Sequence, residues 1–179
     1  MQNARMESRL RLPNPENMTD AQRAIHAEVL ATRGNAQGPF LAWLLSPGLA
    51  DPAQKLGAFC RYGTSLPLAE SELLILAVAA HYRCSGEQRI HEPIALEAGV
   101  PSEVVAAIRE GRDPPLQGDR ERLLFECASA LLADKALPDA LYRRAVAAFG
   151  EKTLVEVVGI IGYYAFVAYT LNAFEMRPT

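Results

Sequence analysis

The chain has 179 residues, half of them hydrophobic and 22% charged, a composition that indicates a globular protein and excludes a disordered one. Its formal net charge is -3 and its Lys and Arg residues are scattered, which argues against a nucleic-acid surface. The N-terminus contains no apolar stretch typical of a secretory signal, and the longest apolar run, residues 157–171, is shorter than the ~20 residues that span a bilayer. We therefore expect a soluble, cytoplasmic protein with no nucleic-acid or membrane partner.

The hydrophobic pattern predicts an all-α protein. Apolar residues recur every three or four positions, and proline and glycine fall at segment ends instead of at hairpin turns. Thr19 and Gln22 have the spacing of a capping box at the first helix. We expect a loose N-terminal segment (residues 1–18) and a single helical domain (residues 19–179). In chain order, helices are predicted over residues 20–33, 40–45, from 51 onward, 68–82, 85–98, 102–110, 119–133, 138–149 and 152–174.

The three cysteines, Cys60, Cys84 and Cys127, are widely spaced and include no C-x-x-C pair. Neither a zinc knuckle nor a dithiol redox motif is therefore indicated. Free thiols of this kind are typical of a reducing cytoplasm, where they behave as small hydrophobic groups. We interpret Cys60 and Cys127 as structural.

One predicted helical hairpin carries four side chains suited to chemistry. Glu87 and His91 are four residues apart, so they share a helix face, and Cys84 lies at the start of the same stripe. Glu72 is on the preceding helix, which a tight turn can bring alongside. An imidazole titrates near neutrality, a nearby carboxylate raises its basicity, and a helix N-terminus favours the thiolate of a cysteine. Together, these groups are suited to proton transfer or to thiol chemistry.

Each of these residues also has a simpler interpretation. A Glu-x-x-x-His pair is often a solvated ion pair, and Glu72 is placed to stabilise the first turn of its helix. We interpret Glu70 as a surface residue and His26 and His81 as boundary or surface histidines. A metal site made from these carboxylates and histidines has no recognised ligand spacing, so no metal or cofactor is expected. Spacing alone leaves the function open.

Residues 66–81 and 84–100 together resemble the carboxymuconolactone decarboxylase family, which includes the alkyl hydroperoxidase D proteins. The familiar pattern is an R-E-x-x-I-L helix, a turn, and then E-W-x-x-H-x-x-x-A-x-x-x-G. Ser71 replaces the usual Arg and Gln88 the usual Trp. The resemblance covers roughly residues 38–174. It implies an all-helical, alkyl hydroperoxidase D-like fold that assembles as trimers or hexamers, which suits the strongly apolar last helix.

In hydroperoxidase members of this family, a glutamate, a C-x-x-C pair and a histidine form a proton relay. Glu72, Cys84 and His91 match the glutamate, the first cysteine and the histidine, whereas Glu87 stands in place of the second cysteine. An intramolecular disulfide within the motif is therefore impossible. A glutamate here resembles the decarboxylase-like branch, which removes carbon dioxide from a carboxylated γ-lactone to give an enol-lactone.

Three functions follow as expectations. The first is a small-molecule, decarboxylase-like lyase in which His91 is the general acid, Glu87 orients it and Glu72 assists proton movement. The second is a one-cysteine, peroxiredoxin-like hydroperoxidase with Cys84 as nucleophile, whose sulfenic acid an external thiol resolves. The third is a helical oligomer that binds a ligand without catalysis. Four aromatic residues are candidates to line a pocket, although apolar packing is the expected role for most of them: Tyr163, Tyr164, Trp43 and Phe40.

Overall fold

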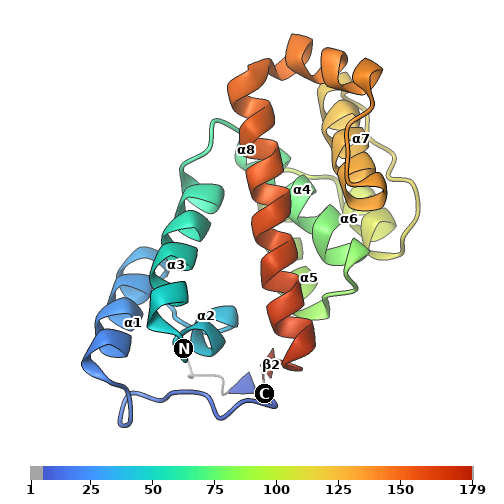
Figure 1. Ribbon diagram of the computed structural model, residues 1–179. Helices are drawn as coiled ribbons and strands as arrows, with labels where there is room; N and C mark the ends of the chain where they lie inside the picture. Colours follow the sequence, from blue (N-terminus) through green and yellow to red (C-terminus); the bar gives the residue numbers. More distant parts are fainter. Residues whose placement is uncertain (1–5, 179) are drawn as a thin grey trace. The chain divides into compact units, whose positions relative to one another are not determined.

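The computed structural model describes residues 6–178 (Figure 1). These residues form eight helices and one short pair of strands, so the predicted all-α class is confirmed. The strands β1 (Met6–Glu7) and β2 (Arg177–Pro178) pair in antiparallel fashion. Two residues are too few to show an alternating pattern, which is why the sequence gives no sign of them. The helices are α1 (Asp20–Arg33), α2 (Pro39–Trp43), α3 (Pro47–Tyr62), α4 (Leu68–His81), α5 (Ser85–Glu97), α6 (Ser102–Arg109), α7 (Asp119–Asp134) and α8 (Asp139–Ala173).

The helices group into two compact units. The first contains the described residues up to Tyr62 and those from Tyr169 onward, and the second is Gly63–Ala168. The division expected from the sequence, a loose segment before residue 19 and one domain after it, remains a prediction.

In the first unit, α1 and α2 both pack against α3. Thr19 caps α1 through the predicted box, since its hydroxyl accepts from the Gln22 amide and the Gln22 side chain accepts from the Thr19 amide. The indole Nε1 of Trp43 donates to the hydroxyl of Thr170 over 3.0 Å, which joins α2 to the end of α8.

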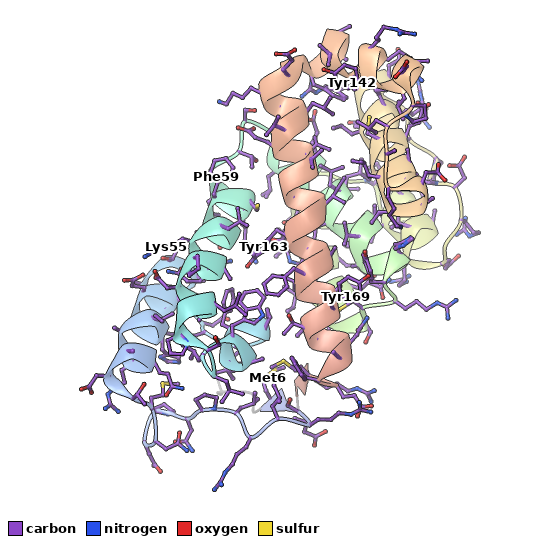
Figure 2. The ribbon with its side chains drawn as sticks, viewed as in Figure 1. Met6, Lys55, Phe59, Tyr142, Tyr163 and Tyr169 are labelled. Carbon is purple, nitrogen blue, oxygen red and sulfur yellow. The ribbon has the colours of Figure 1, made fainter. Side chains whose placement is uncertain are left out.

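The predicted start of α3 at residue 51 is wrong, because the helix begins at Pro47 and runs through Pro52. A proline inside a helix removes the hydrogen bond to the carbonyl four residues earlier, here that of Gly48. Gly48 is exposed, so water can satisfy this carbonyl and the helix tolerates the proline. The outward side of α3 carries Lys55 and Phe59, one turn apart (Figure 2).

In the second unit, α4 is the central helix and packs against α5, α6 and α7. Every residue from Glu70 to Ala79 is buried. One apolar cluster joins α4 to α5 and α6, and a second joins α7 to the first part of α8. Because α4 is covered on all sides, its polar residues must find partners inside the protein.

The prediction that Glu70 is a surface residue is wrong. Its side chain is 11% exposed and binds Arg120 of α7 through both oxygens, at 2.7 and 3.0 Å. The guanidinium of Arg120 also lies over the Phe149 ring and donates to the Ala148 carbonyl. A residue 50 positions away in the chain thus turns an apparent surface carboxylate into a structural ion pair.

Gly150 divides α8 into the two helical stretches predicted for residues 138–149 and 152–174. Its φ of 77° is left-handed, a conformation that glycine adopts without the Cβ clash of other residues. By length and composition alone, α8 could cross a membrane, but 61% of its most apolar window is buried in the structure. That degree of burial is typical of the core helix of a soluble protein, so the resemblance to a membrane span is weak.

Candidate active site

The hairpin of α4 and α5 positions the residues singled out in the sequence. The helix α4 ends at His81, and Arg83 reverses the chain with a φ of 50°. The amide of Cys84 donates to the carbonyl of Ala79 over 2.8 Å, which closes the turn. Cys84 is then the N-cap of α5. The turn lays α5 back along α4, as predicted (Figure 1).

The hairpin brings Glu72, Glu87 and His91 together. Nδ1 of His91 donates to Oε2 of Glu72 over 2.7 Å, and Nε2 of His91 lies 3.4 Å from Oε2 of Glu87. The residues are 0%, 5% and 2% exposed in the order Glu72, Glu87, His91. One imidazole is thus held between two carboxylates in a site almost closed to solvent.

The two contacts of the His91 imidazole differ in strength. The 2.7 Å contact to Glu72 is a short, charge-assisted hydrogen bond, whereas the 3.4 Å contact to Glu87 is beyond the usual length. Glu72 therefore fixes the tautomer and orientation of the ring. Nε2 is the nitrogen that is freer to exchange a proton with another molecule.

Glu72 also keeps one oxygen without a hydrogen bond. Its Oε1 is fully buried and has no partner among the described residues. An unpaired buried acceptor costs about 1–3 kcal/mol, and more when it is charged. Structural networks usually satisfy such atoms, so this oxygen marks the cluster as unusual.

The surroundings of His91 favour its protonated form. Burial lowers the pKa of His91, but the hydrogen bonds and negative charges of Glu72 and Glu87 outweigh burial and leave the pKa above its ordinary value. The two carboxylates therefore favour the imidazolium form of His91. A buried, protonated imidazole beside two carboxylates can act as a general acid.

Burial of the Cys84 thiol opposes the thiolate form that a helix N-terminus favours. Burial raises the pKa of Cys84, and the charge of Glu87 adds to this, while the amides of Glu87 and Gly86 oppose it without prevailing. The side chain is 1% exposed. Desolvation and low exposure therefore favour the protonated form of the Cys84 thiol.

The other two cysteines have the environment expected of structural residues. Cys60 and Cys127 are free and buried, and burial raises the pKa of each to about 11. The histidines outside the cluster are also as expected, since His26 is half-buried and His81 is exposed. No group of three or more His, Cys, Asp or Glu side chains suited to a metal ion occurs within residues 6–178.

Tyr164 of α8, one of the aromatic residues expected as candidates to line a pocket, is a neighbour of the cluster. Its ring lies 5.3 Å from that of His91, centroid to centroid, at an angle of 88°. The two residues are 73 positions apart and share no motif, so only the packing of α8 reveals the contact. The cluster itself is almost closed to solvent, since Glu72, Glu87 and His91 are all buried.

Residues 47–130, which contain the whole hairpin, match the model of the carboxymuconolactone decarboxylase family. This segment is similar to the carboxymuconolactone decarboxylase family and makes up slightly less than half of the chain. The resemblance seen in the sequence is thereby confirmed, and Glu72, Cys84, Glu87 and His91 all fall inside the family segment. No curated protein matches the chain in sequence.

Solved structures share the fold over nearly the whole chain. A peroxidase-related protein from Silicibacter sp. TM1040 is 15% identical, with a TM-score of 0.80 over 100% of this chain and 95% of that one. A peroxidase-related protein from Ralstonia eutropha JMP134, described as an alkylhydroperoxidase AhpD core, is 18% identical, with a TM-score of 0.79 over 96% and 92%. The debrominase Bmp8 is 15% identical, with a TM-score of 0.74 over 94% and 90%. At these identities the likeness establishes the alkyl hydroperoxidase D-like fold and leaves the activity open.

Proposed function

We propose that this protein is a small-molecule enzyme in which His91 exchanges a proton with its substrate, assisted by Glu72 and Glu87. The observation that carries the proposal is the buried imidazole between two carboxylates, one of which keeps an unpaired oxygen. A network that served stability alone would satisfy its acceptors. Polar groups held at a cost in stability are typical of functional sites.

The reaction that fits this arrangement is decarboxylation of a carboxylated lactone or a related acid. The bond between the ring carbon and the carboxylate breaks, carbon dioxide leaves, and the electron pair remains on the conjugated ring as an enolate. The His91 imidazolium then donates its proton to carbon, which gives the neutral product and a neutral imidazole. Solvent returns the proton, so the reaction needs no cofactor.

Each residue of the cluster has a role in this scheme. Glu72 stabilises the imidazolium through Nδ1 and holds the ring in place. Nε2 delivers the proton, because its contact with Glu87 is the longer one. Glu87 lies where it can orient Nε2 and guide the returning proton. The low exposure of His91 and Glu72 strengthens these charge interactions, and substrate entry requires nearby side chains to move.

The test is turnover of a panel of carboxylated γ-lactones, followed as release of carbon dioxide. Wild type is compared with His91→Gln and with His81→Gln, which changes an exposed histidine outside the cluster. We expect His91→Gln to lower kcat by about 10²–10⁴-fold, the usual contribution of a general acid, and His81→Gln to have little effect. Unchanged turnover in His91→Gln would refute the proposal.

A one-cysteine hydroperoxidase is the second candidate, favoured by the position of Cys84 at the N-cap of α5. In that reaction the thiolate attacks the peroxide O–O bond, which yields an alcohol and a sulfenic acid at Cys84. Two external thiol groups then reduce the sulfenic acid, releasing water and forming a disulfide between themselves. The raised pKa and burial of Cys84 disfavour this chemistry.

Consumption of an organic hydroperoxide with dithiothreitol as reductant separates the two candidates. Cys84→Ser is compared with Cys127→Ser, a matched change at another buried, free cysteine. We expect wild type to show only the background rate of a free thiol. Catalytic consumption that Cys84→Ser alone abolishes would establish the hydroperoxidase instead. A further compound to test with the same variants is 2,3,4-tribromopyrrole. It is the ligand in a complex of the debrominase Bmp8 in which a cysteine is replaced by alanine.

The third candidate is a non-catalytic helical oligomer, for which the double variant Glu72→Ala, His91→Ala is informative. A clear gain in stability would support a functional cluster, and a loss would support a structural one.

We also propose a cytoplasmic homo-oligomer, a trimer or hexamer. The support is the apolar surface on α8, where Val155 is 71% and Val158 is 47% exposed. Light scattering after size exclusion tests the oligomeric state.

A further inference from the structure

The ring of Tyr164 reaches the His91 imidazole from a helix outside the α4–α5 hairpin. The two rings are nearly perpendicular, at 88°, with centroids 5.3 Å apart. Both residues are buried, at 4% exposure for Tyr164 and 2% for His91. Perpendicular ring pairs at this distance have the favourable edge-to-face geometry of aromatic contacts.

This contact restrains a motion that the two carboxylates leave open. Glu72 and Glu87 engage the two nitrogens, and hydrogen bonds of this kind act close to the plane of the imidazole. They set the direction of the nitrogens but resist tilting of the ring only weakly, especially at the 3.4 Å contact with Glu87. A flat, buried ring standing perpendicular to the imidazole blocks that tilt by direct contact.

We infer that Tyr164 is a positioning residue, whose ring holds His91 in the orientation where Nδ1 meets Glu72 and Nε2 faces Glu87. The inference rests on the proposed function only for its consequence in turnover. Its structural content is independent, because the orientation of His91 can be measured without a substrate.

Tyr163 provides a matched control. It precedes Tyr164 on α8 (Figure 2), is equally buried at 5% exposure, and packs against the Tyr164 ring with centroids 5.4 Å apart. Consecutive helix residues point about 100° apart, so the two rings occupy different surroundings. A general effect of disturbing aromatic packing on α8 would follow from changing either tyrosine.

The experiment is nuclear magnetic resonance of protein labelled with ¹⁵N-histidine. The chain has three histidines, so the ring signals can be assigned with His26→Gln and His81→Gln. A proton on Nδ1 in a short, buried hydrogen bond to a carboxylate resonates far downfield and exchanges slowly with water. This signal reports directly on the His91–Glu72 contact.

We expect Tyr164→Phe to keep the downfield signal, because the ring is retained. Tyr164→Met and Tyr164→Leu should broaden or lose the signal, because the imidazole can tilt and its proton exchanges with water. Tyr163→Met should keep it. Circular dichroism and thermal unfolding identify which variants remain folded. The inference is overturned if a folded Tyr164→Met or Tyr164→Leu protein keeps the signal unchanged, or if Tyr163→Met loses it equally.

Turnover extends the test once a substrate is identified. We expect Tyr164→Met to lower kcat by roughly tenfold or more with little change in KM, because misplacing the acid affects the chemical step. Tyr164→Phe, which retains the aromatic ring, should keep the kcat of wild type. If His91→Gln keeps full turnover, the proposed function fails, while the resonance measurement still decides whether Tyr164 positions His91.

Discussion

Glu70 and Glu72 are two buried glutamates on α4, only two residues apart, and they differ in how completely their carboxylate oxygens are hydrogen-bonded. Glu70 gives both oxygens to the Arg120 guanidinium, so its charge is neutralised and its hydrogen bonds are complete. Glu72 gives one oxygen to His91 and keeps the other unpaired, with a second carboxylate, Glu87, on the far side of the imidazole. Glu156 on α8 resembles Glu70, since the hydroxyl and amide of Ser65 donate to it and lower its pKa.

The pairing of their oxygens distinguishes a structural carboxylate from a candidate functional one. Glu70 and Glu156 each join two elements through well-paired contacts, which is what stability requires. Glu72 instead keeps one oxygen without a hydrogen bond, next to the titratable ring of His91. The predictions below use substitutions that separate these two kinds of site, beginning with the largest expected effect.

Glu72→Gln and Glu70→Gln should differ most in activity. Glu72→Gln removes the charge that supports the His91 imidazolium, so we expect kcat on an identified substrate to fall about 100-fold or more. Glu70→Gln leaves the cluster intact and should keep the turnover of the folded protein within about twofold. The measurement is kcat for both variants, each normalised to folded protein. Equal losses in the two variants would contradict the distinction.

The loss in the free energy of unfolding should be greater for Glu70→Gln than for Glu72→Gln, the reverse of the order in activity. Glu70→Gln breaks an ion pair whose carboxylate is buried but whose arginine is 43% exposed, so solvent screening reduces the loss to about 1–2 kcal/mol. Glu72→Gln removes a charge that is incompletely paired and should cost less, or even stabilise the fold. Urea unfolding of both variants at neutral pH tests the order. A greater loss in Glu72→Gln would mean that the cluster is primarily structural.

The protonation of His91 should make stability depend on pH in a defined direction. Because the pKa of His91 in the folded state is raised above 6.5, the proton favours folding. This contribution is complete below the unfolded pKa and disappears as pH rises through the folded pKa. The free energy of unfolding of wild type, relative to His91→Gln, should therefore fall as pH rises above about 6.5. His81→Gln, a change at an exposed histidine outside the cluster, serves as the control.

The smallest effect concerns Cys84. Since burial raises the pKa of its thiol and the side chain is 1% exposed, alkylation by iodoacetamide near neutral pH should be at least roughly tenfold slower than for an unstructured cysteine peptide. The assay uses a single-cysteine protein carrying Cys60→Ala and Cys127→Ala, and denaturant should restore the ordinary rate. Rapid alkylation of the folded protein would favour the hydroperoxidase candidate.

Much of the local structure could be predicted from the sequence because short-range physics determines it. The Thr19 capping box, the left-handed Gly150 and the turn before Cys84 all follow from residue type and spacing. The contact of Glu72 with the helix face that carries Glu87 and His91 also follows from the sequence, because a tight turn makes the two helices pack antiparallel. The predicted start of α3 at residue 51 is wrong because proline is common in the first turn of a helix, whereas Pro52 lies inside α3.

The all-α class, the hairpin and the set of ionisable groups on it could be predicted from the sequence, since periodicity and turn chemistry act over a few residues. The environment of each group depends on tertiary packing. Arg120 reaches Glu70 from 50 residues away, and Tyr164 reaches His91 from 73 residues away. Burial also raises the pKa of Cys84, against the effect of the helix N-terminus. Partners, desolvation and pKa depend on which distant segments pack together, and no local pattern contains that information.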